Sequence, residues 1–263
     1  MSWLRPLGST AMQVSALGLG TVKLGRNQGV KYPAGFTIPD DRQAGALLAQ
    51  ARDLGINLID TAPAYGNSEQ RLGHLLKGQR DQWLICSKVG EEFEDGASRF
   101  DFSPEHTRFS VQRSLQRLNT AVIDIVLVHS DGNDMAIMRE LGTLEALADL
   151  KREGLIRAYG VSTKTAQGGV AAAERCDVVM LTYNLAQRDE LPVLDACARL
   201  GKGALIKKAL ASGHLEPSSA NPVQASMDLV FGHPGTSAAI VGTITPDHLE
   251  ANVVAVRRTL GLG

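Results

Sequence analysis

The sequence predicts an α/β protein that forms a single (β/α)8 TIM barrel over residues 1–263. Its length of 263 residues is close to the about 250 residues typical of such barrels. Short, nearly continuous apolar runs alternate with longer amphipathic segments along the whole chain, which is typical of parallel strands covered by helices on both faces. No linker or change of composition divides the chain. A doubly wound sheet is the alternative architecture, and the regular alternation favours the barrel.

Eight apolar runs are expected to form the barrel strands, and a helical stretch follows nearly every one. The runs are residues 15–19, 56–60, 83–87, 123–128, 156–161, 178–182, 204–207 and 239–241. Ser103 before Pro104 places an N-cap residue ahead of a proline in the first helical turn. Thr245 before Pro246 repeats this signal near the C-terminus. Helices are therefore predicted to begin at residues 104 and 246.

Two longer stretches are each interpreted as one element. Residues 138–153 are expected to form one helix that Gly154 closes. Residues 89–103, after the third strand, are acidic and aromatic and are expected to form a long functional loop. Three aromatic residues in this loop are candidates for an apolar wall of a substrate pocket: Phe93, Phe100 and Phe102.

Composition excludes several classes of protein. The formal net charge of −1 argues against a nucleic-acid partner, which normally requires a basic surface. No apolar run approaches the about 18 residues of a membrane span, and the first residues do not resemble a signal peptide. The three cysteines have no metal-like spacing, which predicts free thiols, no metal site and a cytoplasmic location.

Polar side chains follow three neighbouring strands at the point where each strand ends. Asp60 ends the second strand and Tyr65 follows it, Lys88 ends the third, and His129 ends the fourth. The carboxyl ends of the strands form the active-site face of a barrel, so these four side chains are expected to converge. Each of them alone is more often a cap, solvated or packing residue, but their joint placement favours a catalytic site.

These segments resemble the aldo-keto reductase family. The resemblance is carried by Asp-Thr-Ala-Pro-Ala-Tyr-Gly-Asn-Ser-Glu at residues 60–69, Ser-Lys-Val-Gly at 87–90, Asp-Ile-Val-Leu-Val-His at 124–129 and Gly-Leu-Ile-Arg-Ala-Tyr-Gly-Val-Ser at 154–162. It extends from about residue 7 to residue 252 with the motifs in the expected order. The resemblance implies the same barrel fold and an NAD(P)H-dependent reduction of a small aldehyde or ketone.

The resemblance also implies a role for each residue at the strand ends. Tyr65 would donate a proton to the carbonyl oxygen of the substrate, which gains negative charge during the reduction. The pKa of a free phenol is about 10, and Lys88 is expected to lower the pKa of Tyr65. Asp60 would hold Lys88 charged, and His129 would hydrogen-bond the substrate oxygen.

The cofactor residues that the resemblance implies depart from the family pattern in several places. They are Gly20, Thr21, Ser162, Thr163, Met180, Lys207, Lys208, Leu210, Ser212, Gly242, Thr243, His248 and Asn252. Thr163 stands where Asn is usual and Met180 where Gln is usual. Lys207 replaces the aromatic residue that stacks on the nicotinamide, and its aliphatic stem is a candidate to cover the ring.

The expected cofactor is NADPH, with NADH as the open alternative. Family members often carry Lys or Arg near the last strand and helix to bind the 2′-phosphate, where this chain has Gly242 and His248. Weak discrimination between the two cofactors is therefore expected. Thr243 and Asn252 remain compatible with the adenosine end, and Lys207 and Lys208 with the pyrophosphate.

Two other functions remain as alternatives. One is a catalytically weak barrel that binds NADPH and acts as a regulatory or redox-sensing module. The other is a metal-dependent hydrolase using Asp60, His129, Asp131 and Asp134, although no metal-binding spacing is present and Lys88 would repel a cation. The chain also stops after its last helix, without the C-terminal loop that closes many family pockets, so an open pocket with broad carbonyl acceptance is expected.

Overall fold

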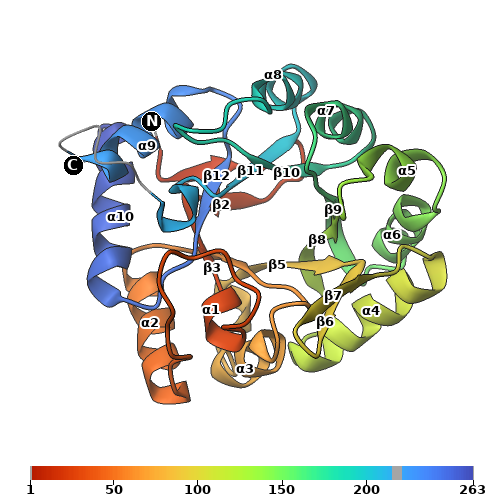
Figure 1. Cartoon of the computed structure of the whole chain (residues 1–263), viewed down its shortest axis with the longest axis horizontal. Helices are drawn as coiled ribbons and strands as arrows, with labels where there is room; N and C mark the ends of the chain where they lie inside the picture. The colour runs from red at the N-terminus through yellow and green to blue at the C-terminus, as the bar shows by residue number, and fades with distance from the viewer. Residues whose placement is uncertain (1, 215–220, 263) are drawn as a thin grey trace.

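The computed structural model describes residues 2–214 and 221–262, and its centre is a closed barrel of parallel strands (Figure 1). In order around the barrel, the strands are β3 (Leu17–Gly20), β4 (Leu58–Asp60), β5 (Leu84–Val89), β8 (Ile123–His129), β9 (Ile156–Ser162), β10 (Val178–Thr182), β11 (Gly203–Lys207) and β12 (Ala238–Val241). The barrel closes where β12 pairs with β3, with Ala239 opposite Leu17. This closure confirms the (β/α)8 barrel and excludes the doubly wound sheet.

A ring of helices surrounds the strands (Figure 1). One longer helix follows each barrel strand: α2 (Asp41–Asp53), α3 (Ser68–Leu75), α4 (Pro104–Arg117), α6 (Thr143–Arg152), α7 (Ala166–Arg175), α8 (Leu191–Leu200), α9 (Pro222–Gly232) and α10 (Pro246–Thr259). Ser103 caps α4 as predicted, because its hydroxyl accepts a hydrogen bond from the His106 N–H at 3.2 Å. Thr245 occupies the corresponding position before α10 but makes no side-chain capping bond.

A β-hairpin precedes the barrel, and the sequence analysis did not separate it from the first strand. It consists of β1 (Leu4–Pro6) and β2 (Gln13–Ser15), which pair in antiparallel fashion. Residue 15, expected in the first barrel strand, therefore belongs to the hairpin. Leu7 and Met12 lie between its strands in sequence and pack with the side chains inside the barrel.

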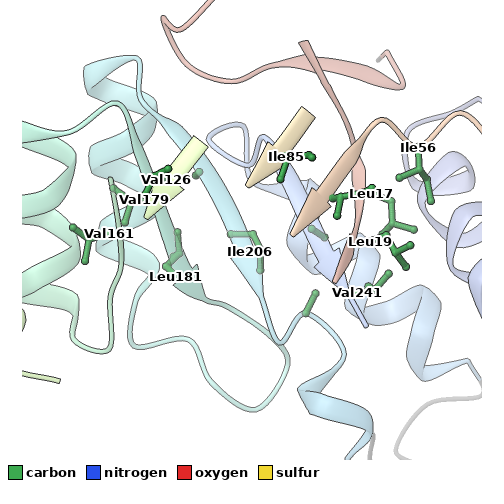
Figure 2. Packing of buried hydrophobic residues seen from close by; sticks show 14 of the residues in the cluster. Leu17, Leu19, Ile56, Ile85, Val126, Val161, Val179, Leu181, Ile206 and Val241 are labelled. Carbon is green, nitrogen blue, oxygen red and sulfur yellow. The ribbon is translucent and has the colours of Figure 1, made fainter. Parts of the chain in front are cut away.

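Alternation along the strands produces two hydrophobic layers. Inside the barrel lie side chains such as Leu58 and Leu127. The alternate residues, such as Val126 next to Leu127, belong to a larger cluster shared with the helices, part of which Figure 2 shows. With both faces of the sheet buried, the apolar runs in the sequence are nearly continuous.

The stretch 138–153 is not one helix, contrary to the sequence prediction. It contains the end of α5 (Asp134–Arg139) and all of α6. Gly142 separates them with a φ of 75°, a left-handed conformation that glycine adopts without steric cost. The other short helical turns are α1 (Val22–Gly25), η1 (Arg80–Gln82) and η2 (Ala211–Gly213).

The stretch 89–103 is also not an irregular loop. It folds into an antiparallel hairpin of β6 (Glu91–Glu94) and β7 (Ala97–Phe100). Its two turn residues, Asp95 and Gly96, have φ values of 52° and 81°, and such positive values are typical of a tight two-residue hairpin turn. Figure 1 shows this hairpin beside α4.

Two further expectations concern the surroundings of the protein. Cys86, Cys176 and Cys197 are buried free thiols, as predicted. Across residues 2–214 and 221–262, no helix has the length and apolar character needed to span a membrane.

Candidate active site

The four polar residues at the strand ends line one cavity of about 1130 Å³. Asp60 is the last residue of β4, Lys88 lies next to the end of β5, and His129 is the last residue of β8. Tyr65 follows β4 in the connection to α3. The predicted convergence at the carboxyl ends of the strands is therefore confirmed as geometry.

Lys88 is held in place by two buried oxygen atoms. Its Nζ donates hydrogen bonds to Oδ1 of Asp60 at 2.6 Å and to the carbonyl oxygen of Thr61 at 2.8 Å. Burial disfavours the charged ammonium, but Asp60 together with Tyr65 and Cys86 outweighs this effect, and the pKa of Lys88 lies above its ordinary value. Lys88 is thus a fixed cation on the floor of the cavity.

Tyr65 lies beside this cation, with Lys88 Nζ 4.7 Å from the centre of its ring. Burial is the largest influence on the phenol and raises its pKa above the ordinary value, while Lys88 opposes the rise. The expected lowering of the Tyr65 pKa is therefore wrong for the protein without ligand, because burial and the nearby carboxylates outweigh Lys88. Tyr65 carries its proton at neutral pH.

His129 contacts a carboxylate that the sequence analysis did not identify. Its Nδ1 lies 2.6 Å from Oε2 of Glu91. Burial lowers the pKa of His129, and Glu91 opposes this shift. Burial also opposes ionisation of Glu91, but His129 together with Ser98 and Arg26 outweighs it, and the Glu91 pKa is about 2. The imidazole stands edge-on to the Tyr65 ring, with the centroids 6.3 Å apart.

Nearly all of the predicted cofactor residues line the same cavity. These are Gly20, Thr21, Ser162, Met180, Lys207, Lys208, Leu210, Ser212, Gly242, Thr243, His248 and Asn252. Thr163 does not: its N–H donates to the Met180 carbonyl at 3.0 Å and its hydroxyl to Glu190 at 3.3 Å. The structure therefore places Thr163 behind the cavity wall.

Lys207 lines the cavity, and its ammonium is bonded to two neighbouring groups. Its Nζ donates to the Ser162 hydroxyl at 2.9 Å and to the Thr163 carbonyl oxygen at 2.6 Å. Burial lowers the Lys207 pKa to about 8, and the nearby Glu190 opposes this shift. The ammonium is thereby fixed beside Ser162.

One wall of the cavity comes from a segment that sequence reasoning missed. Residues 31–36, between α1 and α2, line it. The Tyr32 and Phe36 rings meet edge to face with centroids 5.7 Å apart, and Lys23 Nζ lies 4.0 Å from the centre of the Tyr32 ring. A Cβ added to Gly242 would lie 3.1 Å from the Tyr32 hydroxyl oxygen, so the absence of a side chain at Gly242 allows this close approach.

The aromatic residues predicted as the substrate wall lie elsewhere. Phe93 stacks under the guanidinium of Arg26, whose Cζ is 3.3 Å from the centre of its ring. Phe100 and Phe102 stack on one another. None of the three lines the cavity.

The residues considered for a metal site have structural roles. Asp134 accepts hydrogen bonds from the Thr165 hydroxyl and from the backbone N–H groups of Lys164 and Thr165. Asp131 accepts from the N–H of Asn133 at 2.8 Å. In the part of the chain that the structure describes, no group of three His, Cys, Asp or Glu residues could hold a metal ion.

The model of the Aldo/keto reductase family matches residues 16–228. The chain therefore belongs to the aldo/keto reductase family and is an oxidoreductase, of a class that uses nicotinamide cofactors to interconvert carbonyl compounds and alcohols. A solved structure described as a proposed aldo-keto reductase from Pseudomonas aeruginosa is 58% identical, with a TM-score of 0.90, and the match covers 98% of this chain and 96% of that one.

Curated relatives are more distant. The uncharacterized oxidoreductase YqkF of Bacillus subtilis is 29% identical over 222 residues, or 78% of this chain and 67% of that protein. The NADH-specific methylglyoxal reductase of Escherichia coli is 36% identical over 170 residues, or 60% of this chain and 51% of that protein. The matched region thus spans only about half the length of some of the relatives.

Proposed function

We propose that this chain is an NAD(P)H-dependent reductase that transfers a hydride to a small aldehyde or ketone, with Tyr65 as the proton donor. The observation that carries the proposal is the convergence of Tyr65, the Asp60–Lys88 pair and His129 on one cavity. A phenol that keeps its proton at neutral pH, beside a fixed cation, suits the reduction of a carbonyl group.

The residues present fit a dinucleotide. The cavity extends from the four candidate catalytic residues to the start of α10, where Thr245 lines it. The beginning of a helix favours anionic groups, and Lys23, Lys31, Lys164 and Lys208 add positive charge along the walls. When bound, a nicotinamide cofactor supplies the hydride, so the protein has only to position groups and move a proton.

Each residue near the reacting oxygen has a distinct task. Tyr65 gives its proton to the oxygen as negative charge develops there, and becomes a phenolate. Lys88 stabilises that phenolate, and Asp60 and the Thr61 carbonyl keep the ammonium oriented. His129, when protonated, donates from Nε2 to the same oxygen, and Glu91 favours the protonated form.

NADPH is the proposed cofactor, with weak discrimination against NADH. Gly242 offers no side chain to a 2′-phosphate, and neither Gly242 nor His248 supplies the Lys or Arg that often stands there in the family. A relative is named as an NADH-specific reductase, which supports use of either dinucleotide within the family. We expect the dissociation constants of NADPH and NADH to differ by less than about a hundredfold, that is, by less than about 2.7 kcal/mol of binding free energy. A thousandfold preference for NADPH would contradict this expectation.

The decisive experiment follows the loss of NADPH absorbance with an activated aromatic aldehyde as the substrate. The wild-type chain should oxidise NADPH, and Tyr65→Phe should lose at least about a hundredfold in kcat because the proton donor is gone. Cofactor binding by Tyr65→Phe, measured by fluorescence, should stay within about twofold of wild type, well under 1 kcal/mol. Tight cofactor binding without turnover on many carbonyl compounds would instead favour the regulatory alternative.

A further inference from the structure

We propose that Lys207 is a positioning cation that makes the cavity bind the reduced nicotinamide more tightly than the oxidised one. This inference rests on the proposed function, since it assumes that a nicotinamide ring reaches the floor of the cavity. It adds a role for Lys207 that concerns the redox state of the cofactor rather than its attachment.

The position of Lys207 is fixed by the ends of three strands. Lys207 is the last residue of β11, and its side chain reaches past β10 to Ser162 at the end of β9. Two of its three N–H groups are accounted for by the Ser162 hydroxyl and the Thr163 carbonyl oxygen, at 2.9 and 2.6 Å. The ammonium is therefore held in one place on the lining that it shares with Lys88 and His129.

The charge of Lys207 is not neutralised by a direct ion pair. Among the described residues, no carboxylate oxygen lies within 4.0 Å of its Nζ, whereas Lys88 has Asp60 at 2.6 Å. Glu190 is the strongest influence of opposite sign on Lys207, and its oxygens accept from the Thr182 N–H and the Thr163 hydroxyl at 3.1 and 3.3 Å. Lys207 therefore contributes a positive charge to the floor of the cavity, whereas the charge of Lys88 is balanced by Asp60.

This charge distinguishes the two forms of the cofactor. The oxidised nicotinamide ring carries a positive charge and the reduced ring is neutral, while the phosphates are the same in both. For hydride to reach a carbonyl carbon whose oxygen contacts Tyr65, the ring has to lie on the same floor. Lys207 therefore repels the oxidised ring only, and this repulsion is strong where little water separates the charges.

The same charge is sensitive to pH. The charged groups that influence Lys207 are Glu190 before α8, Asp134 of α5, Lys88 of β5 and the adjacent Lys208, and His129 of β8 is a further titratable group close to it. Burial sets the Lys207 pKa at about 8, so the repulsion is present at pH 7 and is lost as the pH rises above that value. Burial keeps His129 neutral and Tyr65 protonated across this range.

The test measures dissociation constants of NADPH and NADP+ by fluorescence or calorimetry between pH 7.0 and 9.5. For the wild type, the ratio of the NADP+ constant to the NADPH constant should fall about tenfold over this range. Lys207→Met, which keeps a long side chain without charge, should show that lower ratio at pH 7 and no pH dependence. Lys207→Arg should keep the wild-type ratio at pH 7 and hold it up to pH 9.5, because its guanidinium does not lose its proton.

Lys208→Met is the matched control, since it also removes a lysine charge from the lining but makes no bond to Ser162. It should weaken the binding of both NADPH and NADP+ by a similar factor and leave the ratio of their dissociation constants unchanged.

The proposal is overturned if Lys207→Met weakens the binding of NADPH and NADP+ equally, or if the wild-type ratio of dissociation constants does not change with pH. If the wild type binds neither dinucleotide, the proposed function itself is wrong. The wild-type titration decides the matter even if a Lys207 variant does not fold.

Discussion

At the scale of single residues, the ionisable side chains of the candidate site are buried and need partners. Lys88 is nearly inaccessible, with 1% of its side chain exposed, and Asp60 has 5% exposed. A charge so far from water is stable only with a partner of opposite sign and good hydrogen bonds. His129 and Glu91 form a second contact, and the His129 ring stands edge-on to Tyr65. Each pair joins side chains from neighbouring segments, so the site also ties these segments together.

Removal of Lys88 should therefore reduce stability as well as activity. Lys88→Met leaves Asp60 buried without a cation, and we expect a loss of about 3–5 kcal/mol in the free energy of unfolding. Urea denaturation measures this loss. The double variant Asp60→Asn/Lys88→Met should recover part of it because the unpaired charge is gone. A Lys88→Met variant as stable as the wild type would contradict the importance of the pair.

The contact between His129 and Glu91 predicts a pH profile. Carbonyl reduction should slow as the pH rises through the His129 pKa, which burial places below its usual value, because the neutral ring offers a weaker bond to the substrate oxygen. Glu91 opposes the effect of burial on His129, so Glu91→Gln should lower the His129 pKa further. The decline in kcat should then occur at lower pH than in the wild type.

Glu92→Gln is a suitable control for this measurement. Glu92 is the next residue in the same hairpin, but its carboxylate contacts Arg113 and His106 rather than His129. The pH profile of Glu92→Gln should match that of the wild type. A Glu91→Gln profile that also matches the wild type would show that Glu91 has no influence on His129.

At the scale of elements, the approach of two barrel strands depends on one glycine. Gly160 in β9 lies opposite Val178 in β10, and a Cβ added to Gly160 would lie 1.7 Å from the Val178 carbonyl oxygen. Gly160→Ala can be accommodated only if the strands move apart, which we expect to cost about 3 kcal/mol in the free energy of unfolding. The midpoint of chemical denaturation checks this value.

Gly45→Ala is the matched control, and its expected effect has the opposite sign. Gly45 lies within α2, and the nearest atom to an added Cβ would be a Leu75 methyl group at 3.7 Å, an ordinary contact. Alanine in a helix is favoured over glycine by about 0.5–1 kcal/mol. If both variants had the same effect, the close approach at Gly160 would not be the cause.

The repeated elements could be predicted from the sequence because burial on both faces leaves a periodic signal. The predicted strand at 178–182 agrees with β10, and the predicted start at Pro104 agrees with α4. Two of the elements that were missed, the β6–β7 hairpin and the break between α5 and α6, depend on one or two turn residues. Asp95-Gly96 is a known signal for a tight hairpin turn, and Gly142 marks the break between α5 and α6. Both signals are present in the sequence, but the longer pattern around them suggested a single element.

The candidate site was predictable where its residues follow the strands and was missed where they come from loops. Asp60, Lys88 and His129 are at strand ends, so the strand pattern alone places them. Glu91 reaches His129 only because residues 91–100 fold back as a hairpin, and Tyr32 reaches the cavity only through tertiary packing. The Asp95-Gly96 signal would have placed Glu91 at the base of that hairpin. No periodic signal marks Tyr32.

At the scale of the whole molecule, the barrel separates the region that fixes the fold from the region that binds. The N-terminal hairpin and the side chains inside the barrel form one buried cluster, and the cavity lies at the carboxyl ends of the strands. Residues from β3, β9, β11 and β12 all line the cavity, so they belong to strands on different sides of the barrel. A ligand that contacts all of them would link segments that are far apart in sequence.

Binding of a dinucleotide should therefore stabilise the whole protein. A ligand at one hundred times its dissociation constant adds about 2.7 kcal/mol to the free energy of unfolding if only the folded state binds it. For a chain of about this length, that corresponds to a rise in Tm of about 5–10 °C. Differential scanning calorimetry with NADPH measures the shift. NADP+ at the same concentration and pH 7 should raise the Tm less, because Lys207 opposes the oxidised ring. An equal shift with both forms would contradict the role of Lys207, and the absence of any shift would contradict dinucleotide binding.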